Sequence, residues 1–434
     1  MKKVVKWFFI IYAIYLVLTW LYLFMFTHPG VPKAFIGTAA DPTVFMSPKQ
    51  ILLSQHYSRI QDWIYFINLP FDWGIYLVVI CFGWSRWLRD RSKEVTRHSI
   101  IHMAIFWLAL SIISWILTLP LDLSAHYVSI HYGVSVQGLS SWFKDQLTSF
   151  WVDWLITFVS VVVIYFFIRR NPKRWWLPVW LLSIPFTIFL VFIQPVVIDP
   201  LYNDFHPLKA SPLKTEILDL AAKANIPAHN VYEVDMSDKT NSMNAYVNGI
   251  GSHLRIVLWD TTVSRLKNKE VLFVMAHEMG HYVMHHLFLS LIGSIFIILV
   301  GLFFTAKVLV AIVNRWGGRL DIRHPGDLAT LPIVFLIFSV LSTIGSPLES
   351  AVSRHYEHQA DAYAVQMTKD PQAGITAFQE LTKVGLSDVN PPGLIKFMTY
   401  DHPTMLDRIK YLQKEEDTLA KEKKASPSQS TNSK

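Results

Sequence analysis

The sequence contains little charge and almost no cysteine. Of its 434 residues only 16% are Asp, Glu, Lys or Arg, whereas 52% are hydrophobic. A soluble globular chain of this size would not tolerate that imbalance, so much of the apolar surface must face lipid. The one cysteine, Cys81, has no partner in the chain for a disulfide or a cysteine-based zinc site. These shortages exclude an intrachain disulfide framework and predict an integral membrane protein.

The formal net charge is +7, which by itself would suit a nucleic-acid partner. Most of the basic residues, however, lie in short runs beside apolar segments, where they set membrane topology. We therefore expect the lipid bilayer, and no nucleic acid, as a partner.

Seven apolar runs are each long enough, at about 20 residues, to cross a hydrocarbon core of roughly 30 Å. They cover residues 4–26, 63–84, 100–121, 150–168, 175–198, 287–306 and 328–344. The first run lacks a small-residue cleavage site, so we expect a retained membrane helix and not a signal peptide.

One short motif on a predicted helix carries chemistry. His277-Glu278-Met279-Gly280-His281 places two histidines four residues apart, on one helix face, so that both imidazoles can reach one metal ion. Neutral imidazole suits Zn²⁺, a catalytic zinc site keeps one position open for water, and a neighbouring carboxylate can take the water's proton. The motif is typical of zinc metalloproteases and predicts one zinc ion per chain, with Glu278 as general base.

The segment in front of this motif has the texture of a soluble domain. Residues 213–224 show helical periodicity, and residues 231–234, 244–247 and 255–259 are typical of short strands. The predicted fold is mainly α, with seven transmembrane helices and a small α+β zinc metalloprotease domain split around the last two spans. The expected parts are a five-span membrane domain (1–198), a soluble segment with an edge strand and the metal helix (199–286), spans six and seven (287–345), a helical segment completing the zinc site (346–413) and a disordered tail (414–434).

A third metal ligand is needed, and spacing alone does not name it. The candidates are Glu349, Glu357, Asp361, His285, His286, His355 and His358. Glu357 and Asp361 are four residues apart, so one carboxylate can bind metal while the other accepts a hydrogen bond from a ligating imidazole. A solvated acidic helix face is the alternative, and extra histidines at a membrane interface often serve as polar anchors.

Five ordered motifs resemble those of the type I CaaX prenyl endopeptidases, integral-membrane zinc metalloproteases that trim farnesylated proteins. The motifs are Asn244-Ala245-Tyr246, Arg255-Ile256-Val257-Leu258-Trp259-Asp260-Thr261, His277-Glu278-Met279-Gly280-His281, Ser353-Arg354-His355-Tyr356-Glu357-His358-Gln359-Ala360-Asp361 and His402-Pro403. The resemblance covers nearly all of the chain before the tail. The shorter membrane heat-shock zinc proteases share the zinc motifs but have fewer spans in front of them.

The resemblance implies a role for each matching residue. It implies that His277, His281 and Glu357 hold zinc and that Glu278 acts as general base and acid. It also implies that Asp361 orients a zinc-bound histidine, that Arg354 supports the carboxylate helix and that His402 stabilises the oxyanion. Asn244, Ala245 and Tyr246 would form an edge strand that pairs with extended substrate backbone.

The predicted activity is hydrolysis of peptide bonds in membrane-associated or prenylated, CaaX-like peptides, without a covalent intermediate. The alternative is a non-enzymatic membrane metal-binding protein or transporter. A transporter would place ionisable residues inside the spans as a pathway, but the spans hold few carboxylates beyond Asp72 and Asp153. We expect a peptide or protein substrate, a monomer, and a multi-pass protein of a prokaryotic plasma membrane.

The loop charges predict a membrane orientation. Sixteen basic residues fall in four segments: Lys2, Lys3 and Lys6; Arg86, Arg89, Arg91, Lys93 and Arg97; Arg169, Arg170, Lys173 and Arg174; Lys307, Arg315, Arg319 and Arg323. With seven spans all four segments lie on one side, which the positive-inside rule assigns to the cytoplasm. The zinc site would then face outward, whereas the family resemblance implies a zinc site facing the cytosol.

Overall fold

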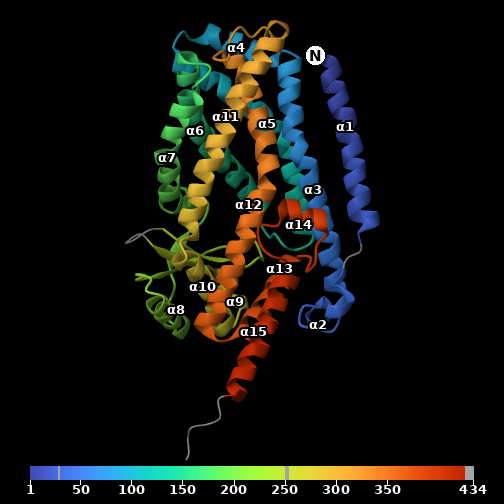
Figure 1. Cartoon of the computed structure of the whole chain (residues 1–434), viewed down its shortest axis with the longest axis vertical. Coiled ribbons are helices and arrows are strands. Elements are labelled where there is room, and N and C mark those ends of the chain that lie inside the picture. The colour runs from blue at the N-terminus through green and yellow to red at the C-terminus, as the bar shows by residue number, and fades with distance from the viewer. Residues whose placement is uncertain (28–29, 250–253, 426–434) are drawn as a thin grey trace, which may run out of the picture.

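The chain forms an upright bundle of long helices, with a small sheet and several shorter helices at one end (Figure 1). The computed structural model describes residues 1–27, 30–249 and 254–425. Within these residues seven helices are long and apolar enough to cross a membrane, which confirms the predicted number of spans. They are α1 (Lys2–Leu21), α3 (Pro48–Cys81), α5 (Ser99–His131), α6 (Leu139–Arg170), α7 (Trp176–Ile193), α11 (His286–Leu320) and α12 (Leu331–Thr368), with π-helical turns at Tyr22–Phe26 and Gln194–Ile198 extending α1 and α7.

Several spanning helices are longer than a bilayer requires. The helices α3, α11 and α12 contain 34, 35 and 38 residues, whereas about 20 residues cross the hydrocarbon core. Helix α12 continues through Pro347, because a membrane helix can tolerate proline where neighbouring groups satisfy the freed backbone. The division expected between residues 345 and 346 therefore falls inside one helix. The seventh span and the segment with Glu357 form one continuous helix.

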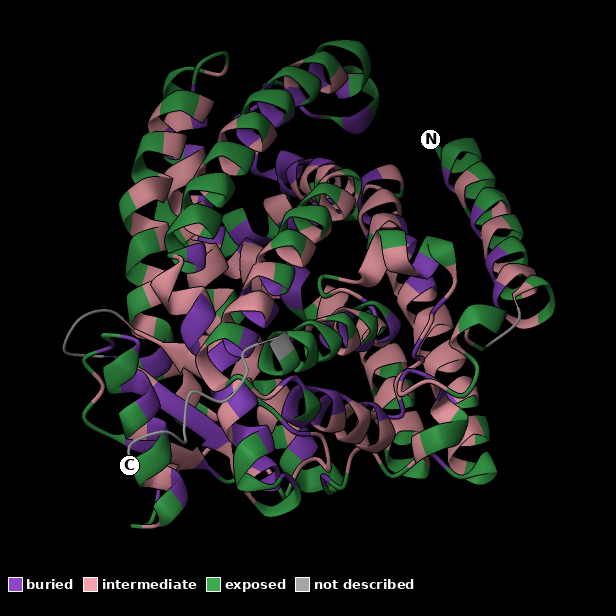
Figure 2. Ribbon diagram, turned by 60° about the horizontal axis from the view of Figure 1, so that its bottom comes forward, coloured by how far each residue is buried: buried purple, intermediate pink, exposed green. Residues whose placement is uncertain are grey.

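The surfaces of these helices are apolar where they face outward. Trp7 and Ile11 on α1 are each 62% exposed, and Ile292 and Phe296 on α11 are each 64% exposed. In Figure 2 the helix that follows the N-terminus is coloured as exposed or intermediate along most of its length. Exposed apolar side chains of this size on long helices are stable only against lipid.

The small sheet has four strands in the order β1-β2-β4-β3. The strands are β1 (Phe205–Pro207), β2 (Val231–Val234), β3 (Ala245–Asn248) and β4 (Arg255–Trp259). Strand β4 runs parallel to β2 and antiparallel to β3, with Ala245 opposite Leu258. Strand β3 stands at the end of this order, so one of its sides has no strand partner among the described residues. Strand β1 has no counterpart among the strands predicted from the sequence.

Most of the shorter helices lie toward the end of the bundle that carries the sheet, and α4 (Trp84–Val95) lies at the opposite end (Figure 1). The others are α2 (Pro42–Phe45), α8 (Pro212–Lys223), α9 (Asp260–Arg265), α10 (Asn268–Val283), α13 (Pro371–Gly385), α14 (Gly393–Thr399) and α15 (Met405–Ala425). Buried residues of α8, β2, β4, α10, α13 and α15 form one continuous apolar core. This core fixes α10 and the end of α12 relative to the sheet.

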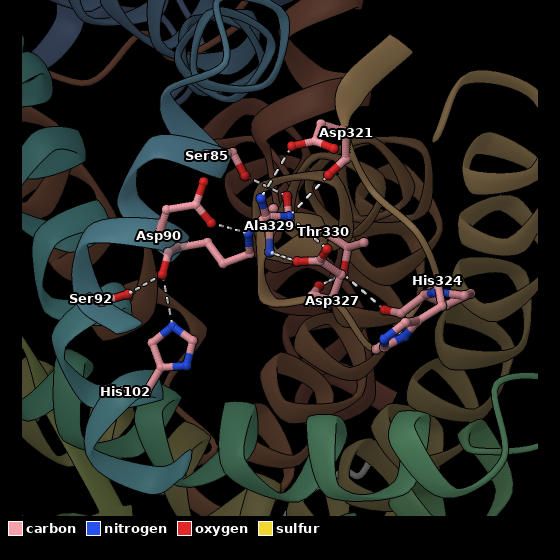
Figure 3. A network of polar contacts seen from close by, with 12 residues as sticks. Ser85, Asp90, Ser92, His102, Asp321, His324, Asp327, Ala329 and Thr330 are labelled. Atoms are coloured by element: carbon pink, nitrogen blue, oxygen red, sulfur yellow. Dashed lines mark hydrogen bonds and ion pairs between the residues drawn. The ribbon is translucent and has the colours of Figure 1, made fainter. Parts of the chain in front are cut away.

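A polar network fastens the bundle at the end opposite the sheet (Figure 3). Arg89 on α4 forms ion pairs with Asp327 at 2.7 Å and Asp321 at 3.5 Å, both between α11 and α12. Ser85 on α4 donates a hydrogen bond to the carbonyl oxygen of Ala329. Helix α4 is thus tied to the connection between the last two spans.

The C-terminal segment differs from the prediction. The disordered tail was expected from residue 414, but α15 continues as a helix to Ala425. Lys, Glu, Leu and Ala favour helix, and Leu419 packs against the apolar core. The prediction was therefore wrong for residues 414–425, and residues 426–434 lie outside the described part of the chain.

Candidate metal centre

Helix α10 carries the two histidines of the motif and begins at a capped end. The carboxylate of Glu270 accepts a hydrogen bond from the backbone N–H of Lys267 at 2.8 Å, which satisfies one of the free donors at the helix start. Gly280, between the histidines, faces α12. A methyl group there would lie 3.2 Å from the Cβ of Tyr363 and 3.3 Å from the Cα of Ala360. The glycine therefore lets α10 and α12 approach closely enough for both to contribute to one site.

Three potential metal ligands meet where these helices cross. The Nε2 atoms of His277 and His281 are 3.2 Å apart, and each lies 3.2 Å from one carboxylate oxygen of Glu357. Their ligand atoms all lie within 4.8 Å of one another. Atoms bound about 2.0–2.1 Å from a tetrahedral zinc ion are roughly 3.3 Å apart, so the spacing fits such an ion.

The surroundings of Glu357 support the same conclusion. Its side chain is buried, and its Oε2 atom lies 3.2 Å from Nε2 of His277 but makes no well-aligned hydrogen bond to any described residue. A buried carboxylate oxygen without a donor is costly, and so are two imidazole nitrogens that face each other at hydrogen-bond distance. A divalent cation among these atoms would satisfy all of them. The set of two imidazoles and one carboxylate is a common donor set of catalytic zinc.

A buried ion pair lies behind His277. Its Nδ1 atom donates to Oδ1 of Asp361 at 2.9 Å, and the guanidinium of Arg408 donates to both carboxylate oxygens of Asp361. Burial lowers the pKa of His277, but the neighbouring carboxylates of Asp361 and Glu357 outweigh burial and raise this pKa to about 9. Asp361 thus holds the ring with Nε2 directed at Glu357 and His281.

A different partner lies behind His281. The Nδ1 atom of His281 is 3.1 Å from Nδ1 of His286, the first residue of α11. His286 is only 3% exposed, and its Nε2 atom is 3.1 Å from Oε1 of Gln359 on α12. His286 was one of the candidate ligands from the sequence. It contacts the ring of His281 but is not one of the three residues that could hold the metal.

A cavity of about 580 Å³ is lined in part by His277, one of the three potential ligands. Its lining includes Glu278 and His402, the two residues expected to act on substrate. Burial raises the pKa of Glu278 above its ordinary value, against the opposing effect of the neighbouring imidazoles. A carboxylate with a raised pKa is a better proton acceptor near neutral pH.

His402 enters the cavity from the loop between α14 and α15. Its Nε2 atom lies 3.4 Å from Glu357, and its Nδ1 atom lies 2.8 Å from Asp401. Burial lowers the pKa of His402, but the hydrogen bond to Asp401 and the negative charge of Glu357 outweigh burial and raise the pKa. The ring thus favours the protonated, donating form that can stabilise an oxyanion.

Arg354 lies on α12 but contacts neither Glu357 nor Asp361 among its described hydrogen bonds. Its guanidinium donates to the carbonyl oxygens of Lys396 and Tyr400 instead. Because Tyr400 precedes His402 by two residues, Arg354 anchors the loop that carries His402. The arginine that supports the carboxylates is Arg408.

The residues expected to bind substrate divide into two groups. Asn244 and Ala245 line the cavity, whereas Tyr246 is not part of its lining. The N–H of Trp259 donates to the carbonyl of Asn244, so these two residues form a hydrogen-bonded pair of the antiparallel ladder. Hydrogen-bonded pairs alternate along such a ladder, so the next one is Tyr246 with Val257. The backbone groups of Ala245 then point to the free edge, where the Asn244 side chain accepts from the Ala245 N–H at 2.8 Å.

The other candidate ligands lie outside the cluster. Glu349, His285, His355 and His358 are exposed on their helices or turns. Arg408, in contrast, was missed from the sequence although it is only 6% exposed. Its neighbours Leu406, Ile409 and Leu412 form the buried stripe of α15, and a charge on such a stripe indicates a buried partner.

A membrane-embedded metalloendopeptidase is the class of protein that this fold and this site define. Comparison with known proteins gives the same class. The chain belongs to peptidase family M48, whose sequence profile matches residues 207–416. A second profile, described as CAAX prenyl protease N-terminal, five membrane helices, matches residues 28–204. The family resemblance inferred from the five motifs is thereby confirmed.

Individual relatives extend over almost the whole chain. An uncharacterized metalloprotease of Bacillus subtilis, YhfN, is 43% identical over 94% of this chain and 95% of its own length. A CAAX prenyl protease 1 homolog of Arabidopsis thaliana is 25% identical over 89% of this chain and 91% of its own length. The crystal structure of S. mikatae Ste24p has the same fold, with a TM-score of 0.78 at 21% identity, covering 94% of this chain and 97% of that one.

Proposed function

We propose that His277, His281 and Glu357 hold one zinc ion and that the protein cleaves membrane-associated peptides beside it. The observation that carries this proposal is the convergence of two imidazole nitrogens and a buried carboxylate at separations of 3.2 Å. When bound, zinc supplies Lewis acidity and lowers the pKa of a bound water from near 16 to about 7. The remaining steps belong to the protein's own side chains.

Glu278 takes the proton of the attacking water and later delivers it to the leaving amine. Its raised pKa supports this role. His402, on the other side of the cavity, donates a hydrogen bond to the oxygen that becomes negative as water adds to the scissile carbonyl. Strand β3 pairs with the extended substrate through the outward backbone groups of Ala245, whose N–H exchanges the Asn244 side chain for the substrate, and so places the scissile bond between Glu278 and His402.

The substrate reaches this cavity from the membrane. The cavity lies next to the membrane-spanning part of α3, because Tyr57, six residues before the apolar run that begins at residue 63, lines it together with residues of α10 and β3. A relative is named CAAX prenyl protease 1 homolog, which favours prenylated, CaaX-like peptides among membrane-associated substrates. We further propose that the protein acts as a monomer in a plasma membrane, without nucleic acid.

The charge distribution suggests which way the site faces. The network around Arg89 lies at the opposite end of the bundle from the sheet (Figures 1 and 3). Arg89 belongs to one of the four basic segments, and such segments favour the cytoplasmic side of a membrane. We therefore propose that the zinc site, at the other end of the bundle, opens outward.

The proposal is tested with purified protein in lipid nanodiscs and a fluorogenic peptide offered with and without a prenylated cysteine. We expect cleavage that stops on chelation and returns when zinc is restored. A matched control is Glu349→Gln, an exposed glutamate on the same helix as Glu357, which should cleave normally. Zinc binding without cleavage of any membrane-associated peptide would favour the metal-binding or transport alternative. Cleavage of prenylated peptides alone would narrow the substrate class.

A further inference from the structure

His286 has a buried position that the catalytic steps above do not use. It is the first residue of α11, it is 3% exposed, and its ring lies on the side of His281 that faces away from Glu357. The preceding residue, His285, has φ of 58°, in the left-handed region that non-glycine residues seldom adopt. This sharp turn between α10 and α11 directs His286 inward, back toward the helix that carries His281.

The ring of His286 is fixed by two residues of α12. It stacks on Tyr356 with ring centroids 4.4 Å apart and planes 12° from parallel. Its Nε2 atom lies 3.1 Å from Oε1 of Gln359. Tyr356 and Gln359 are neighbours of Glu357, so the helix turn that supplies the carboxylate ligand also holds His286.

Only one arrangement of protons satisfies all of these contacts. If Nε2 of His281 binds a metal through its lone pair, the neutral ring carries its proton on Nδ1. That proton points at Nδ1 of His286, which must then be the acceptor and carry its own proton on Nε2. The Nε2–H of His286 donates in turn to the amide oxygen of Gln359, which can only accept. The two hydrogen bonds therefore run in one direction, from His281 to His286 and from His286 to Gln359.

We propose that His286 is a positioning residue that accepts the Nδ1–H of His281 and holds its Nε2 lone pair on the metal. This inference rests on the proposed zinc ligation by His277, His281 and Glu357. Groups that hydrogen-bond a ligating imidazole fix its tautomer and its orientation. His277 receives that support from the carboxylate of Asp361, and His281 receives it from a neutral imidazole.

Electrostatics explains why His281 is supported by a neutral imidazole and not by a carboxylate. Glu278, Glu357 and Asp361 carry negative charge, and Arg408 together with a zinc ion would balance their formal charge. A further carboxylate behind His281 would leave the buried centre with a net negative charge, which costs free energy in a low dielectric. A histidine held by a glutamine amide provides an acceptor without adding charge.

The test compares zinc affinities measured by competition with a chromophoric chelator at neutral pH. His286→Phe keeps a ring that can stack on Tyr356 but removes the acceptor, and we expect zinc to bind about 10- to 100-fold more weakly. His286→Asn loses the stacked ring but places an amide oxygen at the position of Nδ1, and we expect it to recover most of that affinity. His285→Asn, at the exposed neighbouring histidine, should leave zinc affinity unchanged, because asparagine tolerates a positive φ.

Gln359→Leu supplies an independent test if the ring variants fold poorly. It leaves His286 in place but removes the amide oxygen that accepts from Nε2–H of His286. Zinc affinity should therefore fall several-fold, a smaller loss than in His286→Phe because the lost partner is one step further from the metal. In combination with His286→Phe it should cause no additional loss of zinc affinity, because both substitutions interrupt the same series of hydrogen bonds. Melting temperatures in excess zinc report whether each variant is folded.

The outcomes separate this inference from the proposed metal centre. Failure of the unaltered protein to bind zinc, or undiminished binding by His281→Phe, would overturn the metal centre itself. Zinc binding by the unaltered protein together with equal affinity in His286→Phe and Gln359→Leu would overturn the role of His286 alone. Weak binding by both His286→Phe and His286→Asn, with equal loss of melting temperature, would show that the ring acts only through packing.

Discussion

Arg408 holds both carboxylate oxygens of Asp361, with its Nη2 atom 2.6 Å from Oδ1 and its Nε atom 2.9 Å from Oδ2. Both side chains are almost completely buried. Asp361 in turn accepts a hydrogen bond from His277, so the ion pair determines how one proposed zinc ligand is aimed. The guanidinium also lies 3.9 Å over the ring of Phe378, which limits its freedom to move.

Removing one member of this ion pair should be costly. In Arg408→Met the carboxylate of Asp361 remains buried without its counter-charge, and we expect the free energy of unfolding to fall by about 3–5 kcal/mol. The double variant Arg408→Met/Asp361→Leu removes both charges and should regain much of that stability. It should not regain zinc affinity, because His277 then has no acceptor for its Nδ1–H. Thermal unfolding in excess zinc and chelator competition measure the two effects, and a single variant as stable as the double would contradict the account.

The two carboxylates of α12 should differ in their effect on the metal. Glu357→Ala removes a proposed ligand and should abolish zinc retention through purification. Asp361→Ala removes only the partner of a ligating imidazole and should weaken zinc affinity by about 10- to 100-fold. Metal analysis of both proteins, with Glu349→Ala as the control on the same helix, distinguishes the roles. Full zinc content in Glu357→Ala would mean that the third ligand lies elsewhere.

The free edge of β3 should matter for substrate binding and not for metal binding. Ala245→Pro removes an outward N–H that the ladder with β4 does not use and that donates only to the side chain of Asn244, so we expect KM for a peptide to rise about tenfold at unchanged zinc content. Tyr246→Phe is the matched control, because the Tyr246 side chain does not line the cavity. Steady-state kinetics on both variants test the prediction. An unchanged KM in Ala245→Pro would exclude backbone pairing at this residue.

The orientation in the membrane follows from single cysteines introduced into a Cys81→Ser background. Glu216→Cys lies on the exposed face of α8 at the sheet end, and Arg91→Cys is exposed on α4 at the opposite end. From the loop charges we expect a membrane-impermeant maleimide to label Glu216→Cys in intact cells and Arg91→Cys only after lysis. The reverse pattern would place the zinc site in the cytosol, as the family resemblance implied.

The fold was largely predictable because its main signals are local. Each span is a single apolar run, and the two histidines of the motif share a helix face through their spacing alone. The helix ends were less predictable. Residues 48–62 of α3 are too polar to resemble a span, yet they continue the same helix beyond the bilayer. The helical tail of α15 was missed because its charge suggested disorder, whereas the packing of Leu419 depends on the tertiary fold.

The rest of the site depends on contacts between distant residues. Asp361 is 84 residues from His277, and Arg408 is 131 residues from it. No periodicity relates positions so far apart, so the spacing of Glu357 and Asp361 made them candidates among others and only the resemblance to a family chose between them. The place of His286 behind His281 could not be read either, because it results from the left-handed turn at His285 and the crossing of α12.

Glu278→Gln examines whether Glu278 moves the proton in a zinc-dependent cleavage of peptide bonds. The substitution keeps the size and shape of the side chain but removes its ability to accept a proton. We expect the purified variant to melt at the temperature of the unaltered protein, to retain one zinc ion per chain, and to cleave peptide at least about 100-fold more slowly. Cleavage by Glu278→Gln at the full rate, with zinc bound, would mean that Glu278 is not the general base.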